Sequence, residues 1–226
     1  ILILVIFGCQ NQKEKLDGFL IKGNIRNLNN SELLILKFVN GGIELDSISA
    51  TNDEFEYTGK VKEPYFIQIL IRDGKETKGK LTEFMIENSE ITITGNSTEY
   101  DSVMVSGSNS DKILKEYFKK DEILSSKWDD LKVEYDKYVE LGDTTNRKEI
   151  AKKLNYILKE ERVGLLKKYV LDYSNTTVGA LLPSFCTFEN ALTKEDYKAL
   201  YECLSEEIKK SDYGMEMLEK SKEQNE

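Results

Sequence analysis

From about residue 19 to residue 107 the chain alternates short apolar runs with turn residues. The runs read GFLIKGNI, ELLILKFV, GIELDSISA, EFEYTGKV, PYFIQILIRD, LTEFMIEN, EITITGN and SVMVSG. Their length and their content of β-branched and aromatic residues predict about eight strands. Phe55 and Tyr57 alternate with polar neighbours, which indicates a sheet with one buried face and one solvated face.

Two dipeptides in this region favour tight hairpin turns. Asn40-Gly41 and Asp73-Gly74 consist of residues that tolerate the positive φ such turns require. Because hairpins join successive strands directly, the expected architecture is an antiparallel β-sandwich or a flattened barrel.

After Gly107 the apolar residues recur at three and four positions, which predicts four to five helices. The expected helices run from a Ser110 cap to about Glu140, from Asn146 with Glu149 as a capping box to about Tyr169, from Thr177 to Glu189 with Pro183 inside, from a Thr193 cap through Ile208, and from Tyr213 to Lys220. The predicted fold class is therefore α+β. Since the connection at Ser106-Gly107-Ser108 is short, the two halves are expected to share an interface.

The first residues have a different character from the rest. Seven apolar residues, Ile1 to Phe7, are too few to cross a bilayer but fit the apolar middle of a secretory signal. The ending Ile6-Phe7-Gly8-Cys9 resembles the lipobox of bacterial lipoproteins, in which the cysteine is lipidated. The alternative is an ordinary first strand with a buried cysteine. The polar run after Cys9 favours the lipoprotein interpretation.

This interpretation divides the chain into four parts. Residues 1–8 are a signal-peptide remnant, 9–18 a lipid anchor and tether, 19–107 a β-sandwich domain and 108–226 a helical domain. The expected location is outside the cytoplasm, with the protein attached to a bacterial membrane through lipidated Cys9, because acyl chains can hold a protein there without a spanning helix. The sequence leaves open whether the protein is attached to the inner or the outer membrane, and on which face of that membrane it lies.

Composition narrows the function classes. A content of 39% apolar residues over 226 positions is enough for one or two packed cores. The net charge of −9 makes nucleic acid a poor partner. The chain has no histidine, which excludes imidazole metal sites and the Ser-His-Asp and Cys-His arrangements.

Several segments resemble a known family in the expected order. FLIKGNIRNL, LDSISATNDEFEYTGKVKEPYF, FMIENSEITITGNS and VMVSGSNSDK resemble a β domain of unknown function at the N-terminus of Bacteroidota thioredoxin-like lipoproteins. TTVGALL and LTKEDYKALYECLSEEIKKSDYGMEML resemble the helical segment that follows it in those proteins. Asp53 or Glu54, and Ser89, stand where the turns of the family usually have glycine.

The resemblance also implies a catalytic part that these residues lack. In most relatives a thioredoxin-like domain with a Trp-Cys-x-x-Cys motif follows the helices and exchanges disulfides. Here the one tryptophan, Trp128, is followed by Asp129-Asp130 and is interpreted as helical core. No catalytic residue, cofactor or metal site is therefore predicted in this chain.

Two further thiols and several carboxylate pairs are candidates for chemistry. Helix geometry places Cys186 and Cys203 too far apart to bridge, so both are expected to be separate buried thiols. The adjacent acidic residues diverge on their helices and are interpreted as solvated faces. These pairs are Asp129-Asp130, Glu160-Glu161 and Glu206-Glu207.

Three classes of function remain. The first is a non-catalytic, lipid-anchored module that holds or presents a partner, which in relatives is the attached thioredoxin-like domain. The second is a stand-alone ligand-binding lipoprotein at the surface or in the periplasm, which an exposed aromatic cleft between sandwich and helices would favour. The third is an independent enzyme that works without histidine.

Overall fold

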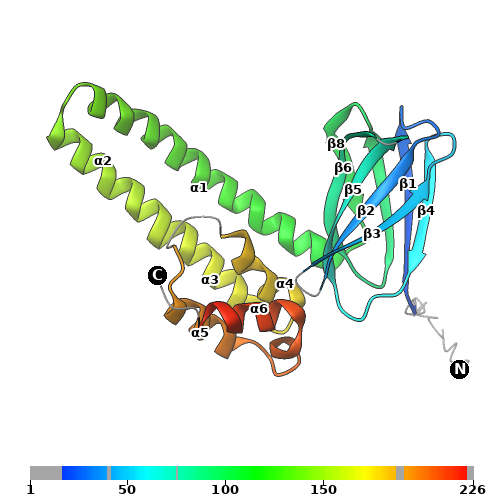
Figure 1. Ribbon diagram of the computed structural model, residues 1–226. Coiled ribbons are helices and arrows are strands. Elements are labelled where there is room, and N and C mark those ends of the chain that lie inside the picture. The colour runs from blue at the N-terminus through cyan, green and yellow to red at the C-terminus, as the bar shows by residue number, and fades with distance from the viewer. Residues whose placement is uncertain (1–16, 40–41, 75, 187–190, 223–226) are drawn as a thin grey trace, which may run out of the picture.

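The computed structural model describes residues 17–39, 42–74, 76–186 and 191–222. It consists of a β-sandwich from which a helical region extends (Figure 1). Cys9, the preceding apolar run and the predicted Asn40-Gly41 turn lie outside the described residues. Asp73-Gly74 does form the predicted corner, and Gly74 has φ +60° there.

In the described part of the chain, eight strands form two four-stranded sheets. Sheet A has the order β4 (Glu54–Gly59), β1 (Phe19–Arg26), β7 (Glu90–Asn96), β8 (Glu99–Ser106). Sheet B has the order β3 (Gly42–Ser49), β2 (Glu32–Val39), β5 (Tyr65–Asp73), β6 (Glu76–Ile86). The predicted α+β class with an N-terminal β-sandwich is confirmed, and the sheets do not close into a barrel.

One strand pair corrects the expected antiparallel pattern. β1 and β7 pair in parallel, with Ile21 opposite Ile91. Sheet B is built from the chain between these two strands, and so long a connection lets the chain return in the same direction. Hairpin turns predict pairing only between strands that are consecutive in the sequence, so they do not predict the β1–β7 pair.

The first core lies between the two sheets. Its fully buried side chains include Ile21, Ile35, Ile69, Phe84 and Ile91. The predicted alternation in β4 is confirmed, since Phe55 is buried and Tyr57 half-buried while their glutamate neighbours are exposed. The turn before β4 contains Asn52 and Asp53 at φ 52° and 70°. Asp53 thus occupies a left-handed conformation of the kind that glycine adopts without strain.

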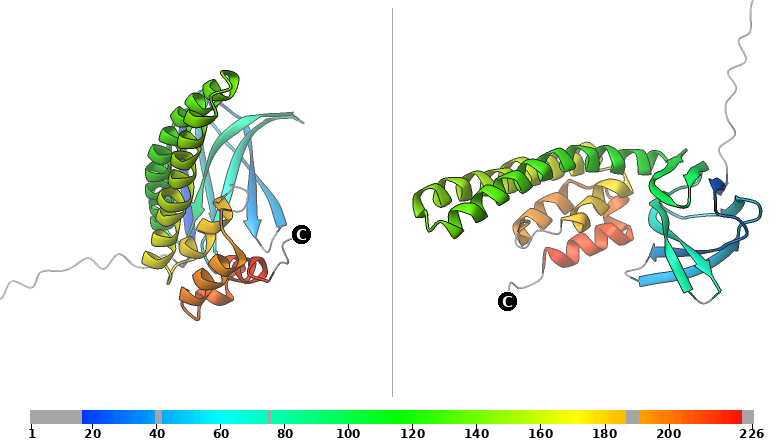
Figure 2. Two further views of the ribbon diagram at one scale, coloured as in Figure 1. Left: turned by 90° about the vertical axis from the view of Figure 1, so that its left-hand side faces the viewer. Right: turned by 90° about the horizontal axis from the view of Figure 1, so that it is seen from above.

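The helical region begins with a two-helix arm (Figures 1 and 2). Helix α1 spans Asn109–Glu140 and returns as α2 (Thr144–Tyr156), a π-helical segment η1 (Ile157–Arg162) and α3 (Val163–Asp172). Their caps differ by two or three residues from the expected ones. Ser108 caps α1 instead of Ser110, and Asp143 caps α2 instead of Asn146, because both side chains accept amide hydrogen bonds from the first helical turn.

The remaining helices gather at the base of the arm. They are α4 (Thr177–Leu181), the 3₁₀ segment η2 (Leu182–Phe185), α5 (Lys194–Cys203), the 3₁₀ segment η3 (Ile208–Lys210) and α6 (Asp212–Lys220). The predicted helix from Thr177 is tighter and shorter, since it becomes 3₁₀ around Pro183. The predicted Thr193 cap is confirmed, and together with Asp196 it forms a capping box that was not predicted. Helix α5 ends at Cys203 because Leu204 is extended.

The π-helical segment η1 sets which side chains face α1 across the arm. A π turn inserts one extra residue and so rotates the helix face that follows it. Arg162 at its end is buried and forms a bidentate pair with Asp121 of α1, at 2.8 Å from Nε and 2.6 Å from Nη2. This pair lies at the base of the arm, beside Tyr117 and Leu166.

The second core joins the helical region to sheet B. Met85 of β6 is fully buried in it, together with α1, α3, α4 and α5 residues such as Leu114, Val170, Leu181 and Leu200. The predicted interface between the two halves is therefore present. Within the described ranges, no helix is both long enough and apolar enough to cross a membrane.

Candidate binding groove

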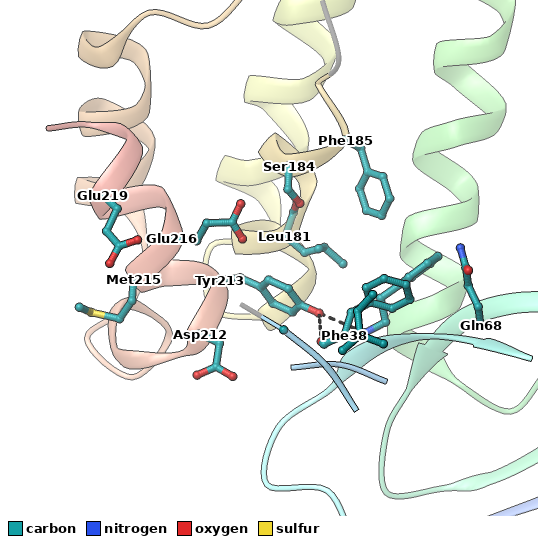
Figure 3. A pocket seen from close by; sticks show the side chains of 13 residues that line it. Phe38, Gln68, Leu181, Ser184, Phe185, Asp212, Tyr213, Met215, Glu216 and Glu219 are labelled. Atoms are coloured by element: carbon teal, nitrogen blue, oxygen red, sulfur yellow. Dashed lines mark hydrogen bonds between the residues drawn. The ribbon is translucent and has the colours of Figure 1, made fainter. Parts of the chain in front are cut away.

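A groove opens between the outer face of sheet B and the helices at the base of the arm (Figure 3). Its volume is about 810 Å³, within the range of ligand-binding clefts. The sheet supplies one wall, and the α4–η2 segment and α6 supply the others. The lining residues are Phe38, Gly42, Ile43, Phe66, Gln68, Leu181, Ser184, Phe185, Asp212, Tyr213, Met215, Glu216 and Glu219.

Aromatic rings form the floor of this groove. Phe66 stands between Phe38 and Phe185, with ring centroids 5.9 Å and 5.7 Å away. Phe185 in turn meets Phe118 of α1 edge to face at 5.0 Å. Offset and edge-to-face contacts hold rings in fixed orientations. The floor is therefore a preformed apolar surface made from three separate parts of the chain.

Tyr213 fastens α6 to the sheet at this floor. Its hydroxyl accepts a hydrogen bond from the amide of Phe66 at 3.1 Å and donates one to the carbonyl of Phe38 at 3.4 Å (Figure 3). These backbone groups belong to β5 and β2, so one side chain ties the helix to both strands. Burial raises the pKa of Tyr213 to about 12, and the hydroxyl stays protonated at neutral pH.

A second set of hydrogen bonds fixes the start of α1 on β6. The Ser108 hydroxyl donates to the Met85 carbonyl at 2.7 Å, and the Met85 amide donates to Asp111 at 3.3 Å. Glu87 accepts from the Asn109 amide at 2.7 Å, a favourable position for a carboxylate at a helix N-terminus. Burial raises the pKa of Asp111. These bonds tie the helical region to sheet B at a second point.

The backbone between β8 and α1 requires glycine. Gly107 has φ +98°, and a Cβ there would lie 2.0 Å from the Glu90 carbonyl oxygen. Any other residue would have to move the strand beside it. The close approach therefore requires glycine where the chain passes from β8 to α1.

The charge of the groove is acidic on one side. α6 presents Asp212, Glu216 and Glu219 along it (Figure 3). Glu216 pairs with Lys220 at 3.0 Å. Among the described residues that line the groove, none is basic. An apolar ligand with positive charge therefore fits this site better than an anionic one.

The predicted thiols are separate, and neither of them is fully buried. Cys186 is half-buried beside the Tyr117 ring, and Cys203 is exposed. The prediction of a buried Cys203 was wrong because α5 ends at this residue, and Leu204 takes the core position instead. Neither thiol forms a disulfide.

Trp128 and the carboxylate pairs take no part in the main helical core. Trp128 is half-buried in the arm and lies outside the main helical core, contrary to its interpretation as core. Asp129, Asp130, Glu160, Glu206 and Glu207 are exposed, and Glu161 is half-buried. Across the described ranges, no three acidic or cysteine side chains gather as they would around a metal ion.

Sequence reasoning did not identify the groove residues. A sequence pattern that indicates the groove was present in β2, where Leu34, Leu36 and Phe38 alternate with the core residues Leu33 and Ile35. A strand that is apolar on both faces is typical of a sheet covered on both sides. The outer face is indeed covered by helices at one end.

Comparison with known families gives one match. Residues 19–114 match the family described as a domain of unknown function (DUF4369). The match covers the eight described strands and the first turns of α1. No curated protein matches the chain. The resemblance of the β region to a domain of unknown function is thereby confirmed.

Proposed function

We propose that the protein is a lipid-anchored, extracytoplasmic module without catalysis of its own that holds or presents a partner, as the N-terminal region of thioredoxin-like lipoproteins does. The observation that carries this proposal is the groove between sheet B and α6. Its aromatic floor is half-buried and lines the groove, and Tyr213 is hydrogen-bonded to the backbone of Phe66 and Phe38, which is the arrangement expected of a preformed binding surface.

The anchoring part of the proposal rests on the sequence Gly8-Cys9 after an apolar run. In a bacterium that processes lipoproteins, we expect the full chain to fractionate with membranes and the Cys9→Ser variant to be released. Cys203→Ser is the matched control, since Cys203 is an exposed thiol outside the lipobox. A Cys9→Ser variant that stays membrane-bound would refute lipid anchoring.

The presenting part is tested by photo-crosslinking in the native host. A benzophenone amino acid replaces Met215 on the groove rim or Met104 on β8, two exposed methionines on different faces. We expect a discrete adduct with one polypeptide from position 215 and none from position 104. Equal adducts from both positions, or none from position 215, would contradict the proposal.

A stand-alone ligand-binding lipoprotein is the second candidate, and the aromatic floor of the groove favours it. This function predicts saturable 1:1 binding of a neutral apolar fluorophore such as N-phenyl-1-naphthylamine. Met215→Glu should weaken binding while Met104→Glu leaves it unchanged. Absence of saturable binding would remove this candidate and leave the partner-presenting module.

A further inference from the structure

Within the described residues, four strands lie at sheet edges: β4 and β8 in sheet A, β3 and β6 in sheet B. Three of them carry features that discourage pairing with another chain. The β5–β6 ladder has two register shifts and the β7–β8 ladder has one. β4 is short, with six residues and two exposed glutamates.

β3 is neither short nor bulged, and its charged side chains, Glu44 and Asp46, are all acidic. It pairs with β2 over eight consecutive residues, from Gly42 opposite Val39 to Ser49 opposite Glu32, without a bulge. The strand GIELDSIS contains no proline and no lysine. It borders the groove, because Gly42 and Ile43 line that cavity. A regular, uncovered edge of this length is a template for one more strand.

The two faces of β3 differ in chemistry. Ile43 and Leu45 are 58% and 65% exposed and lie on the outer face, opposite Phe38 and Leu36 of β2. Glu44 and Asp46 point to the other face, because successive side chains alternate. β3 therefore presents an apolar row beside an acidic row.

The acidic row is only partly neutralised from within the molecule. Asp46 accepts a hydrogen bond from the Tyr57 hydroxyl at 2.9 Å and pairs with Lys37 at 3.2 Å; the Tyr57 bond lowers the pKa of Asp46. Glu44 is exposed and forms no ion pair with any described residue. A strand placed beside β3 would meet this carboxylate directly.

We propose that the β3 edge binds an extended segment of a partner polypeptide, which adds a fifth strand to sheet B and alternates apolar with basic residues. Its apolar side chains continue the row of Ile43 and Leu45, and its basic side chains face Glu44 and Asp46. The inference rests on the proposed partner-presenting function and names the chemistry of that partner.

Charge complementarity selects a basic partner over a second copy of this chain. Two copies of β3 in antiparallel pairing would set the acidic row of one beside that of the other, in molecules that each carry a net charge of −9. Like charges at facing positions of a ladder oppose pairing, while opposite charges favour it. Backbone hydrogen bonding along the edge favours a polypeptide over a small ligand.

The test uses a fluorescent nine-residue peptide that alternates valine and lysine, and the full chain, followed by fluorescence anisotropy. We expect saturable 1:1 binding that weakens at least tenfold when glutamate replaces lysine in the peptide. Two further peptides carry N-methyl groups on alternate residues. One peptide is methylated on the odd-numbered residues and the other on the even-numbered residues, so each series blocks the amides along one edge of the peptide strand. One series should abolish binding and the other should leave it intact, since only one peptide edge pairs with β3.

Matched variants locate the binding strand. Glu44→Lys and Leu45→Asp should each weaken peptide binding at least fivefold. Asp101→Lys and Met104→Asp, which make the same kinds of change on the β8 edge, should leave it within twofold. Amide hydrogen exchange should show peptide-induced protection in β3 and none in β8.

Several results would overturn the inference. The first is that both N-methyl series weaken peptide binding equally. The second is that the β3 and β8 variants change peptide binding equally. The third is that the free chain forms a dimer that dissociates on Leu45→Asp. If the peptide does not bind β3 while Met215 still crosslinks to a partner, the edge proposal fails and the proposed function stands. If the peptide does not bind and Met215 gives no adduct, both fail.

Discussion

Replacing Tyr213 with phenylalanine tests whether a single side chain fastens α6 to sheet B. The substitution removes one oxygen and leaves the ring, so the apolar packing of the groove floor is kept. It deletes the acceptor for the Phe66 amide and the donor to the Phe38 carbonyl. Both backbone groups lie at the junction, where α6 restricts access of water.

The expected cost follows from these two bonds. A hydrogen bond contributes about 1 kcal/mol net to stability, and an amide left without an acceptor at a partly buried site adds about 1 kcal/mol. The Phe38 bond is long at 3.4 Å and is counted at the low end. Tyr213→Phe should therefore destabilise the protein by about 2 kcal/mol, which lowers the Tm of a domain of this size by roughly 4–8 °C.

The pH dependence provides a second readout. The pKa of Tyr213 in the folded protein, about 12, exceeds its ordinary value of 10.0. A raised folded-state pKa means that the contribution of the neutral hydroxyl is fully present below pH 10 and is lost as the pH rises towards 12. The stability difference between wild type and Tyr213→Phe should accordingly be constant from pH 7 to 9 and shrink above pH 10.

Urea unfolding followed by near-ultraviolet circular dichroism measures both effects. Tyr156→Phe on the exposed side of the arm is the control and should change stability by less than about 0.5 kcal/mol. If Tyr213→Phe is as stable as the control, or if its difference from wild type grows above pH 10, then Tyr213 does not hold α6 in the way described.

Three further predictions concern the helical region. Leu200→Ala should cost about 2–5 kcal/mol and lower the midpoint of one cooperative transition; a β half that keeps its own midpoint would show independent domains. Asp121→Ala should cost about 3–5 kcal/mol, because it removes the carboxylate that faces the buried Arg162 guanidinium, whereas the double change Asp121→Leu with Arg162→Met should recover most of that loss; no recovery would contradict this account. The isolated chain should reduce insulin disulfides no faster than a thiol-free control, and turnover that survives replacement of Cys186 and Cys203 would reveal a missed site.

Local signals in the sequence predicted most of the elements. The Thr193 cap, the Asp73-Gly74 corner and the long helix ending near Glu140 depend on residues close together in the chain, and all three were found. The parallel β1–β7 pair was missed because it depends on how the chain crosses between two layers.

The register of the arm shows a second limit of local reasoning. A regular α-helix makes one turn in 3.6 residues, so one residue inserted between Ile157 and Arg162 rotates the side chains that follow by about 100° around the helix axis. The π-helical segment η1 adds one residue and brings Arg162 to Asp121. Hydrophobic periodicity assumes a constant number of residues per turn, so it predicts the helix but not which of its residues faces α1.

The groove and the β3 edge could be predicted only by considering the second apolar face of the strands in sheet B. β2 and β5 are apolar on both faces, and the second face requires a cover. The helices cover it around Phe66 and Met85, yet Leu34, Leu36 and Leu70 stay half-exposed and the apolar row continues onto Ile43 and Leu45 of β3. Since an apolar sheet face that reaches an unprotected edge is a hazard for a free monomer, its persistence here favours a partner strand that completes the sheet.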